Sequence, residues 1–336
     1  MPKLTIVVPV YNAAAYLEQC VHSILTQTFP NFTLLLINDG STDQSGERCD
    51  FFAAQDTRIQ VIHQENIGVE QTILKGIRLA ATPYIGFVDS DDWLLPEMYQ
   101  TMFNALVMHD SDMVQCGALI NGITHSSALT SSQEAIITDA KKTYYRPYFE
   151  TTADLAPLTN ARWSKVYQTD LLQQAITTVP QGVSIGEDLL LNLAYLCQSK
   201  KAIVLADSAY YCYRSNANSL TLKYSDKKHT SILRLYTLLA ELAKQEGFSD
   251  TAVVRQGKNE TCALMLDVLL SALAISEKSN RLRELYIHLA DRHHLLQYAK
   301  ERPLVGRLAL YFVSLRLFWL ISATVSVVNS LTSKKE

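Results

Sequence analysis

The sequence predicts an α/β protein with a mostly parallel central sheet flanked by helices, followed by a helical C-terminal extension. Over the first hundred residues, short apolar runs alternate with segments whose apolar residues recur at helical spacing, which is the pattern of a helix-covered parallel sheet. From about residue 227 to 294 the chain is leucine-rich and has few turn signals. A length of 336 residues, 48% of them hydrophobic, is enough for a large packed core.

The elements of this sheet are expected in order along the first 120 residues. Short apolar runs predict strands at 4–10, 32–37, 59–63, 84–88 and 113–120. Helical spacing predicts helices at 14–27, 69–81 and 96–109, the last of which opens with a proline suited to a first helical turn. The segment 121–155 is rich in Thr, Ser and Tyr and is predicted to be a loop-dominated insertion. Helical periodicity returns after Trp163.

Charge and cysteine content argue against several classes of protein. Thirty Lys and Arg against 33 Asp and Glu give a formal net charge of −3, and the basic residues are scattered, so nucleic acid is not an expected partner. The six cysteines contain no Cys-x-x-Cys pair and are predicted to be buried apolar side chains in a reducing compartment. The start has no signal-peptide pattern, which predicts a cytoplasmic protein. No Gly-x-Gly-x-x-Gly follows the first strand, which disfavours a nucleotide-binding oxidoreductase.

The C-terminal segment 304–331 is apolar, and its charged residues are Arg307 and Arg316. It is long enough to span a bilayer, although Arg316 near its middle would cost roughly 2.5 to 3.5 kcal/mol. On a helical wheel, Arg307 shares a polar face with Ser314, Ser322, Ser326 and Asn329, which favours an interfacial helix, whereas Arg316 points to the other side. Three interpretations stay open: attachment to a membrane surface, a buried or oligomer-forming helix, and a spanning helix.

Three carboxylates stand directly after the predicted fourth strand, at Asp89, Asp91 and Asp92. Residues two apart on a strand point to the same side, so Asp89 and Asp91 can face one point. Two carboxylates that share a site repel each other unless a cation lies between them, and Mg²⁺ or Mn²⁺ prefers such oxygens together with phosphate oxygens. The segment therefore predicts a metal-bound diphosphate site. The alternative is an acidic turn that caps the helix after Trp93.

Polar residues also follow the first three predicted strands, at Tyr11-Asn12, Asp39–Asp43 and Asn66–Gly68. The carboxyl ends of parallel strands form the ligand crevice of an open α/β sheet, so these residues are expected to converge there with Asp89. The carboxylate of Asp39 can accept hydrogen bonds from a base N–H or a ribose hydroxyl. An ordinary turn before a capped helix explains the same residues equally well.

Glu187 and Asp188 precede the apolar run Leu189–Leu191, which places them at a helix start. A carboxylate there can remove the proton of a sugar hydroxyl during attack, and Asp188 is the candidate. Capping of the helix is the alternative. Two sets of aromatic and basic residues could stack on a sugar and contact a pyrophosphate. The alternative, a Trp in the core and an Arg on the surface, is the commoner arrangement in proteins. The two sets are Trp163 with Lys165, and Tyr213-Arg214 with Ser219.

Taken together, these segments resemble the family 2 glycosyltransferases, which have a GT-A fold. The resemblance is strong over residues 1–115 and continues more thinly to about residue 222. The strongly matching stretches are Ile6–Asn12, Leu17–Phe32, Asn38–Asp43, Asn66–Gly68 and Phe87–Asp92, and the weaker ones are Trp163–Tyr167, Gly186–Asp188 and Tyr211–Arg214. The expected organisation is a Rossmann-like GT-A domain at 1–222, divided into a nucleotide-sugar half (1–115) and an acceptor half (116–222), a helical extension at 223–300 and an apolar helix at 301–336.

The resemblance implies a role for each matching residue. Pro9, Tyr11 and Asp39 enclose the nucleotide base, usually uracil, in a donor site completed by Asn12, Asn66 and Gly68. Asp91 is the metal ligand, Asp89 touches the ribose or the metal shell, and Asp188 is the general base. Arg214 lies near the donor diphosphate, assisted by Ser219. Weaker acceptor-side candidates are Trp163, Lys165, Glu187 and Asp92.

The implied activity is inverting transfer of a sugar from a nucleotide sugar, with UDP as the first expectation, to a glycan or lipid-linked acceptor. Mn²⁺ or Mg²⁺ is the implied cofactor, and the implied setting is synthesis of capsule, cell wall or other cell-surface polysaccharide at the inner face of the cell membrane. Neither the sugar nor the oligomeric state follows from the sequence.

The sequence departs from the family pattern after Asn66-Ile67-Gly68. Many relatives continue with Ser-x-Ala-Arg-Asn, whereas this chain has Val69–Lys75 without an Arg. A contact to the donor phosphate, or a structural ion pair, is therefore missing or replaced by Lys75. A catalytically degenerate protein that acts as a scaffold or partner subunit is the alternative, and the carboxylates at 89, 91 and 188 argue against it.

Overall fold

The chain divides into two compact units, Met1–Asn216 and Ala217–Glu336. The computed structural model describes residues 2–120, 123–125, 135–139, 158–179, 182–183, 186–214, 226–245 and 275–289, together with 262, 265, 268, 296, 310–311, 313–318 and 322. All strands described here lie in the first unit, which is the α/β unit predicted from the sequence. The expected subdivision at residues 115, 222 and 300 stays a prediction.

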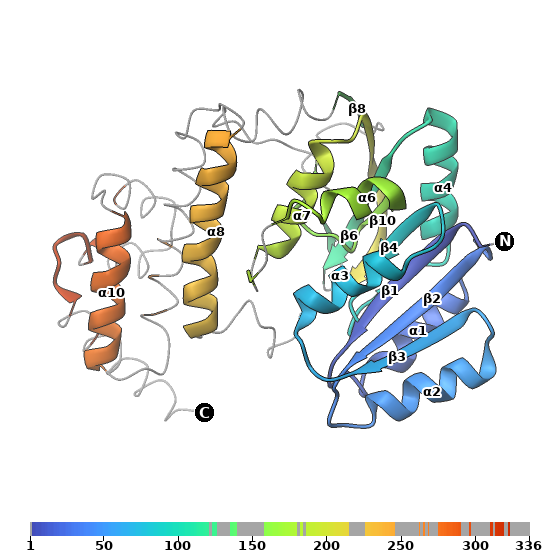
Figure 1. Ribbon diagram of the computed structural model, residues 1–336, viewed down its shortest axis with the longest axis horizontal. Coiled ribbons are helices and arrows are strands. Elements are labelled where there is room, and N and C mark those ends of the chain that lie inside the picture. Colours follow the sequence, from blue (N-terminus) through green and yellow to red (C-terminus); the bar gives the residue numbers. More distant parts are fainter. Residues whose placement is uncertain are drawn as a thin grey trace. The chain divides into compact units, whose positions relative to one another are not determined.

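Four parallel strands form one half of the sheet, in the order β3-β2-β1-β4 (Figure 1). They are β1 (Leu4–Val10), β2 (Phe32–Asp39), β3 (Ile59–Gln64) and β4 (Tyr84–Phe87). Helices cover both faces, so successive residues of a strand are buried on opposite sides. In β1, Ile6 and Val8 join one hydrophobic cluster, whereas Val7 joins the other.

An antiparallel strand connects this half to the rest of the sheet, which continues β9-β6-β10-β5. The added strands are β5 (Trp93–Leu94), β6 (Met113–Ile120), β7 (Ile123–His125), β8 (Ala135–Thr138), β9 (Lys165–Gln168) and β10 (Lys201–Tyr213). β10 runs parallel to β6 and pairs with the short β5 next to the Asp89–Asp92 segment. This pairing brings the end of β10 to the candidate metal-binding turn.

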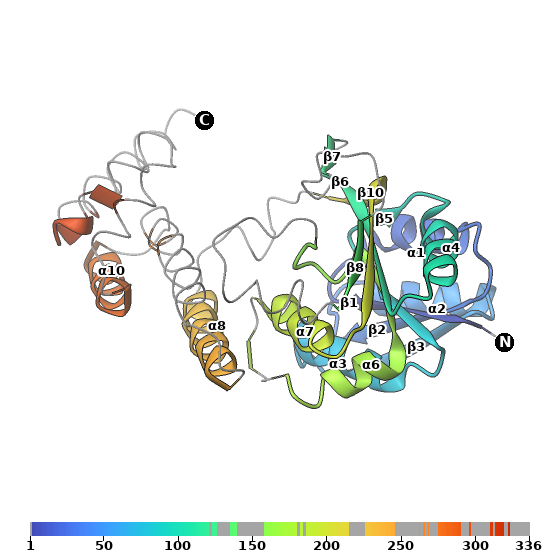
Figure 2. The ribbon, with the colours of Figure 1, turned by 90° about the horizontal axis from the view of Figure 1, so that it is seen from above.

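Two layers of helices enclose the sheet (Figure 2). One face is covered by α1 (Leu17–Leu25), α2 (Ser45–Gln55) and α4 (Met98–His109), and the other by α3 (Val69–Leu79), α6 (Thr169–Ala175) and α7 (Glu187–Leu196). Because Gly76 of α3 has no side chain, the helix can lie close to β1: a Cβ there would be 2.5 Å from Cγ1 of Val7. Packing of the helices on the sheet thereby places the first residues of α3 and α7 at the edge that carries the polar residues.

The structure confirms a mostly parallel sheet flanked by helices and adds elements that the sequence analysis did not predict. α2, β5, β9 and β10 were not expected, and the segment after Trp163 opens with strand β9 before helix α6. The expected helix at 14–27 begins only at Leu17, because the loop before it holds polar contacts to residues 43–45. Within the predicted insertion 121–155, the described residues form the short strands β7 and β8.

The second unit contains helices α8 (Asp226–Gln245) and α10 (Ile275–Leu289). Among the described residues near the C-terminus, the backbone of Arg316 is left-handed, with φ 61°, between helical residues at 313–314 and at Phe318. This interrupts the continuous helix that was expected over 304–331, whether interfacial, buried or spanning. Ser314 and Ser322, which the interfacial interpretation placed on a polar face, are buried, and the guanidinium of Arg316 lies 5.4 Å from the ring centre of Tyr286 in α10. Among the helices that the structure describes, none has the length and apolar character to cross a membrane.

Candidate functional site

The ends of β1, β2 and β4 are neighbours, so the polar residues that follow them meet at one edge of the sheet. Asn12 lies after β1 with a left-handed backbone, φ 50°, and links the turn after β2 to its own loop. Its side-chain oxygen accepts hydrogen bonds from the backbone N–H of Thr42 at 2.8 Å and from the Thr42 hydroxyl at 3.3 Å. Tyr11, beside it, is half exposed and free to contact a ligand ring. Pro9 is partly buried at the end of the same strand.

Asp39, at the end of β2, holds the loop that contains Asn66 and Gly68. The residue is 3% exposed, and its carboxylate accepts hydrogen bonds from the backbone N–H groups of Ile67 and Gly68, both at 2.9 Å. The Gln64 amide donates a third hydrogen bond to it at 2.8 Å. A carboxylate offers about four acceptor positions, so Asp39 keeps capacity for a base or ribose hydrogen.

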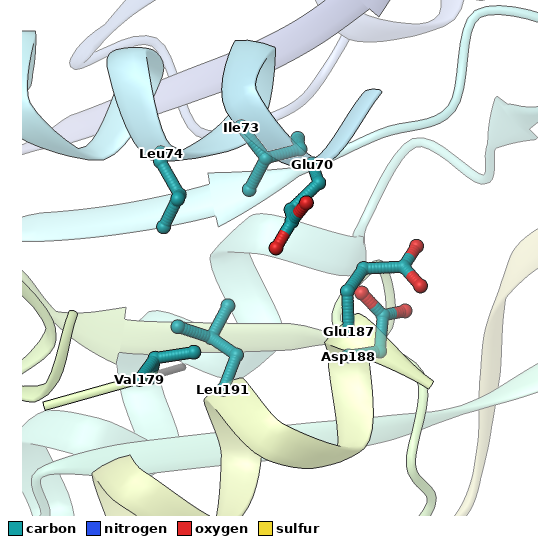
Figure 3. Close-up of a pocket in the computed structure, with 7 residues that line it drawn as sticks. All are labelled: Glu70, Ile73, Leu74, Val179, Glu187, Asp188 and Leu191. Carbon is teal, nitrogen blue, oxygen red and sulfur yellow. The ribbon is translucent and has the colours of Figure 1, made fainter. Parts of the chain in front are cut away.

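Lys75 supports this arrangement indirectly. Its ammonium donates to the Gln64 side-chain oxygen at 2.7 Å, and Gln64 in turn holds Asp39. Lys75, the candidate replacement for the missing Arg, therefore faces β3 and Asp39. Ile73 and Leu74, in the stretch that departs from the family pattern, line a small pocket with Val179 and Leu191, beside the carboxylates of Glu70, Glu187 and Asp188 (Figure 3).

Asp92 joins the candidate metal-binding turn to β10. Its side chain accepts hydrogen bonds from the Tyr211 hydroxyl at 2.7 Å and from the backbone N–H of Arg214 at 2.8 Å. Burial, together with the nearby charge of Asp89, raises the pKa of Asp92 to about 8. The Tyr211 hydroxyl also accepts a hydrogen bond from the backbone N–H of Asp89 at 3.1 Å. The contacts of Asp92 are with the protein, so it shapes the turn.

Arg214, at the end of β10, lies beside the Asp91 backbone. Its Nε donates to the Asp91 carbonyl at 2.7 Å, and its guanidinium lies over the rings of Tyr16 and Trp93 at 4.9 and 4.8 Å. A cation in this position is next to any diphosphate bound at Asp91. Ser219, its expected helper, lies outside the described residues.

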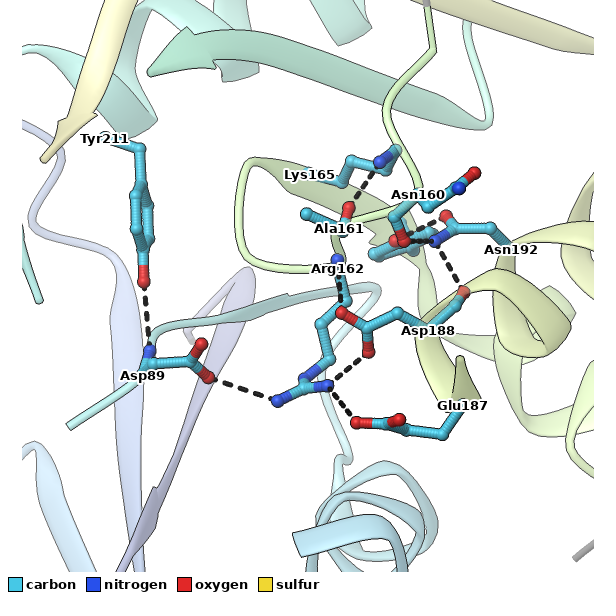
Figure 4. A network of polar contacts seen from close by, with 10 residues as sticks. Asp89, Asn160, Ala161, Arg162, Lys165, Glu187, Asp188, Asn192 and Tyr211 are labelled. Atoms are coloured by element: carbon cyan, nitrogen blue, oxygen red, sulfur yellow. Dashed lines mark hydrogen bonds and ion pairs between the residues drawn. The ribbon is translucent and has the colours of Figure 1, made fainter. Parts of the chain in front are cut away.

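A buried arginine connects the donor side of the site to the candidate base (Figure 4). Arg162 forms ion pairs with Asp89 at 3.1 Å and Glu187 at 3.6 Å, and with Asp188 at close contact. Its backbone N–H also donates to the second carboxylate oxygen of Asp188 at 3.2 Å. Arg162 therefore bridges Asp188 and Asp89, which are 99 positions apart in the sequence.

Arg162 was not among the site residues predicted from the sequence. A lone Arg before a Trp has no characteristic spacing, and its acidic partners lie 26 and 73 positions away. Tyr211 was missed as a site residue for the same reason, although its position one residue before Cys212-Tyr213 was part of the family pattern. An Arg in a segment that is expected to be buried is itself a sign of a buried ion pair, because a charged side chain is rarely buried without a partner.

The two members of the Asp89/Asp91 pair have different surroundings. Burial raises the pKa of Asp89, and the charge of Arg162 opposes this shift. Burial also raises the pKa of Asp91, with a smaller opposing effect from Arg214. When ionised, the carboxylate of Asp91 suits a hard cation, whereas Asp89 already has a cationic partner in Arg162. Within the described residues, no three Asp, Glu, His or Cys side chains are grouped for metal binding. Mg²⁺ commonly takes one or two protein carboxylates together with phosphate oxygens, a set to which Asp91 can contribute.

Trp163 and Lys165 lie under the site. The indole stacks on the Tyr211 ring with centroids 4.3 Å apart, and lies 5.8 Å from the Tyr213 ring. Lys165 is 1% exposed, and its ammonium donates to the carbonyls of Thr159 and Ala161, to the former at 2.7 Å. Lys165 therefore holds the loop from which Arg162 projects, and these hydrogen bonds are made to carbonyl groups of the protein itself.

Comparison with known proteins gives consistent matches. Residues 5–160 match the model of the family described as Glycosyl transferase family 2. The uncharacterized glycosyltransferase EpsJ of Bacillus subtilis (strain 168) is 29% identical over 96% of this chain and 95% of its own length. Glycosyltransferase GlyA of Streptococcus pneumoniae serotype 4 (strain ATCC BAA-334 / TIGR4) is 32% identical over 67% of this chain, which spans only 32% of that protein.

Solved structures share the fold. The crystal structure of S. aureus TarS 1-349 in complex with UDP-GlcNAc aligns with 98% of this chain and 92% of that chain, with a TM-score of 0.56 and 19% sequence identity. The same TarS fragment with UDP aligns with a TM-score of 0.53. At this level of identity the likeness establishes the fold.

Proposed function

The chain belongs to the family 2 glycosyltransferases, and we propose that it moves one sugar from a UDP-sugar to a hydroxyl of a glycan or lipid-linked acceptor with inversion at the anomeric carbon. The observation that carries this proposal is the joining of Asp89 and Asp188 through Arg162, which puts the candidate base at the donor edge of the sheet. The TarS complex with UDP-GlcNAc supports UDP as the nucleotide.

In this proposal Tyr11 and Asp39 bind the uridine. Asp91 would hold a divalent cation, Mn²⁺ or Mg²⁺, which when bound offsets the charge that develops on the departing diphosphate. Arg214, next to the Asp91 backbone, adds a second positive charge on the same side. These groups stabilise the leaving group, so they lower the barrier to breaking the bond between the anomeric carbon and the diphosphate.

Asp188 acts on the acceptor. Its carboxylate takes the hydroxyl proton as the acceptor oxygen attacks the anomeric carbon from the face opposite the diphosphate. The new glycosidic bond forms as the bond to UDP breaks, so the configuration inverts. The balanced products are the glycosylated acceptor, UDP and a proton held on Asp188.

Release of the nucleoside diphosphate from a panel of UDP-, GDP- and CDP-sugars tests the donor and the metal together. We expect release from at least one UDP-sugar with Mn²⁺ or Mg²⁺, and its loss after chelation with EDTA. Asp91→Ala should lower kcat/KM at least about 100-fold, because it removes the proposed cation ligand. Unchanged release by Asp91→Ala, or release that is indifferent to EDTA, would contradict the assigned metal site. Absence of release from every donor would instead favour a scaffold role.

We place the reaction in bacterial cell-surface polysaccharide synthesis, at the cytoplasmic face of the cell membrane. The relatives are bacterial glycosyltransferases, which supports the first part. The apolar composition of residues 304–331 supports the location at the membrane. Because the left-handed backbone at Arg316 interrupts the helix, this segment would attach as shorter pieces and not as one continuous helix. Deletion of 304–336 tests the attachment: membrane partitioning that stays unchanged would contradict it.

A further inference from the structure

Arg162 introduces a full positive charge into the middle of the candidate site. Its side chain is 5% exposed, and it lies in the loop before β9. Burial alone would lower the pKa of this guanidinium, but the charges of Asp188, Asp89 and Glu187 outweigh burial and raise its pKa above the usual range. Arg162 therefore remains charged throughout the pH range in which such a protein is folded.

Both carboxylate oxygens of Asp188 are held by this one residue. The Nη1 group of Arg162 donates to Oδ1, and the backbone N–H of Arg162 donates to Oδ2 at 3.2 Å. Two hydrogen bonds from one residue fix the plane of the carboxylate as well as its position. A carboxylate offers about four acceptor positions, so each oxygen keeps one for an incoming hydroxyl proton.

Arg162 is also anchored at its guanidinium by Asp89 and through the backbone that precedes it. Its Nη2 group donates to Oδ1 of Asp89 at 3.1 Å, on the donor side of the site. Lys165 fixes the backbone just before it by donating to the carbonyls of Thr159 and Ala161. The Nε–H of Arg162 is buried without a hydrogen-bond partner among the described residues. The guanidinium therefore takes the orientation that the carboxylates impose and leaves one of its own donors unsatisfied.

On the basis of the proposed function, we propose that Arg162 is a positioning residue for sugar transfer, which holds the Asp188 carboxylate in the orientation from which it accepts the proton of the attacking hydroxyl. Arg162 acts through Asp188 and does not itself exchange a proton. The guanidinium also ties the base to Asp89, so the base and the donor edge keep a fixed separation.

Substitutions at Arg162 test this role by UDP release from the UDP-sugar that the wild-type protein uses, with water in place of the acceptor. Arg162→Lys keeps the charge but lacks the planar fork, so we expect kcat to fall about 10- to 100-fold while KM for the UDP-sugar changes less than about threefold. Arg162→Gln, which also lacks the charge, should fall further. Arg58→Lys is the matched control, because Arg58 pairs with Asp56 at 2.7 Å in the loop before β3. Its kcat should equal that of the wild type.

A double-mutant cycle with Asp188→Asn separates positioning from a general structural role. If Arg162 acts through Asp188, Arg162→Lys should change kcat less than about twofold in the Asp188→Asn background. Equal losses in both backgrounds, or a lowered melting temperature with kcat unchanged, would overturn the proposal. Failure of the proposed function is distinguishable, because it would appear as no UDP release by the wild-type protein, before any substitution is made.

Discussion

Lys165 lies under the loop that carries Arg162, and burial lowers the pKa of its ammonium to about 7, although the charge of Asp188 opposes the shift. The unfolded chain keeps this proton up to the ordinary value of 10.5. Between about pH 7 and 10.5 the unfolded state therefore binds more protons than the folded state, so the cost of burying Lys165 is full below pH 7 and disappears as the pH rises. The folded state gains stability from this residue with increasing pH.

We expect the difference in free energy of unfolding between wild type and Lys165→Met to shift in favour of the wild type from pH 7 to 9, by at most about 1.4 kcal/mol per pH unit. Loss of the contacts to Thr159 and Ala161 adds an offset that does not depend on pH. Urea unfolding at three pH values measures the difference. Lys201→Met is the control, because Lys201 also donates to a backbone carbonyl, that of His109. A difference that stays constant with pH would refute the titration of Lys165.

Single residues were predictable from the sequence where the chain itself marks them. Asp39 and Asp89 follow buried strands, so their place at the carboxyl edge follows from the sheet. The contacts of Asp92 with Tyr211 and Arg214 were not predictable, because they depend on the pairing of β5 with β10. Arg162 was missed because only the folded chain brings its partners together.

At the scale of elements, the turn after β2 depends on a glycine. Gly40 has φ 69°, and a Cβ there would lie 2.6 Å from the backbone nitrogen of Asn66. The turn and the Asn66–Gly68 loop are thus in direct contact, and Asp39 hydrogen-bonds across them. A side chain at position 40 would push this loop away from Asp39.

We therefore expect Gly40→Ala to lower the free energy of unfolding by about 2 to 4 kcal/mol, from the left-handed backbone and the clash together, and to weaken UDP binding. Gly117→Ala is the control: its backbone does not have a positive φ, and a Cβ there would lie 3.4 Å from the Cα of Ala209, an ordinary contact distance. It should change the free energy of unfolding by less than about 1 kcal/mol. Chemical unfolding and calorimetric titration with UDP measure both effects, and equal costs for the two variants would contradict the close approach to Asn66.

Elements of the first 120 residues were mostly predictable because each parallel strand is a continuous apolar run between helices. The next elements were not. β9 has four residues and is inserted antiparallel between β4 and β6, so its identity as a strand depends on neighbours that are distant in the sequence. β10 is long, but it includes the polar Asp207-Ser208 and its register with β6 shifts nearby, which obscures the regular pattern of a strand.

At the scale of the whole molecule, the hydrophobic clusters of the sheet belong to a single unit. The clusters that cover its two faces both draw their residues from positions 4–211, and all described strands end by Tyr213. The C-terminal segment was the least predictable part, because hydropathy and a helical wheel assume a continuous helix. The left-handed backbone at Arg316 breaks that assumption, and Leu310 and Val313 before it are fully buried.

A fragment of residues 1–216 should therefore fold without the rest of the chain, since a packed core inside one unit is what independent folding requires. We expect a cooperative urea transition and a dissociation constant for UDP within about threefold of that of the full chain, because Tyr11, Asp39 and Asp91 all lie in the fragment. Circular dichroism and calorimetry measure these properties. A fragment that folds but fails to bind UDP, when the full chain binds it, would show that the donor site needs residues from the second unit. A fragment that lacks a cooperative transition would show that the sheet depends on the helical extension for its stability.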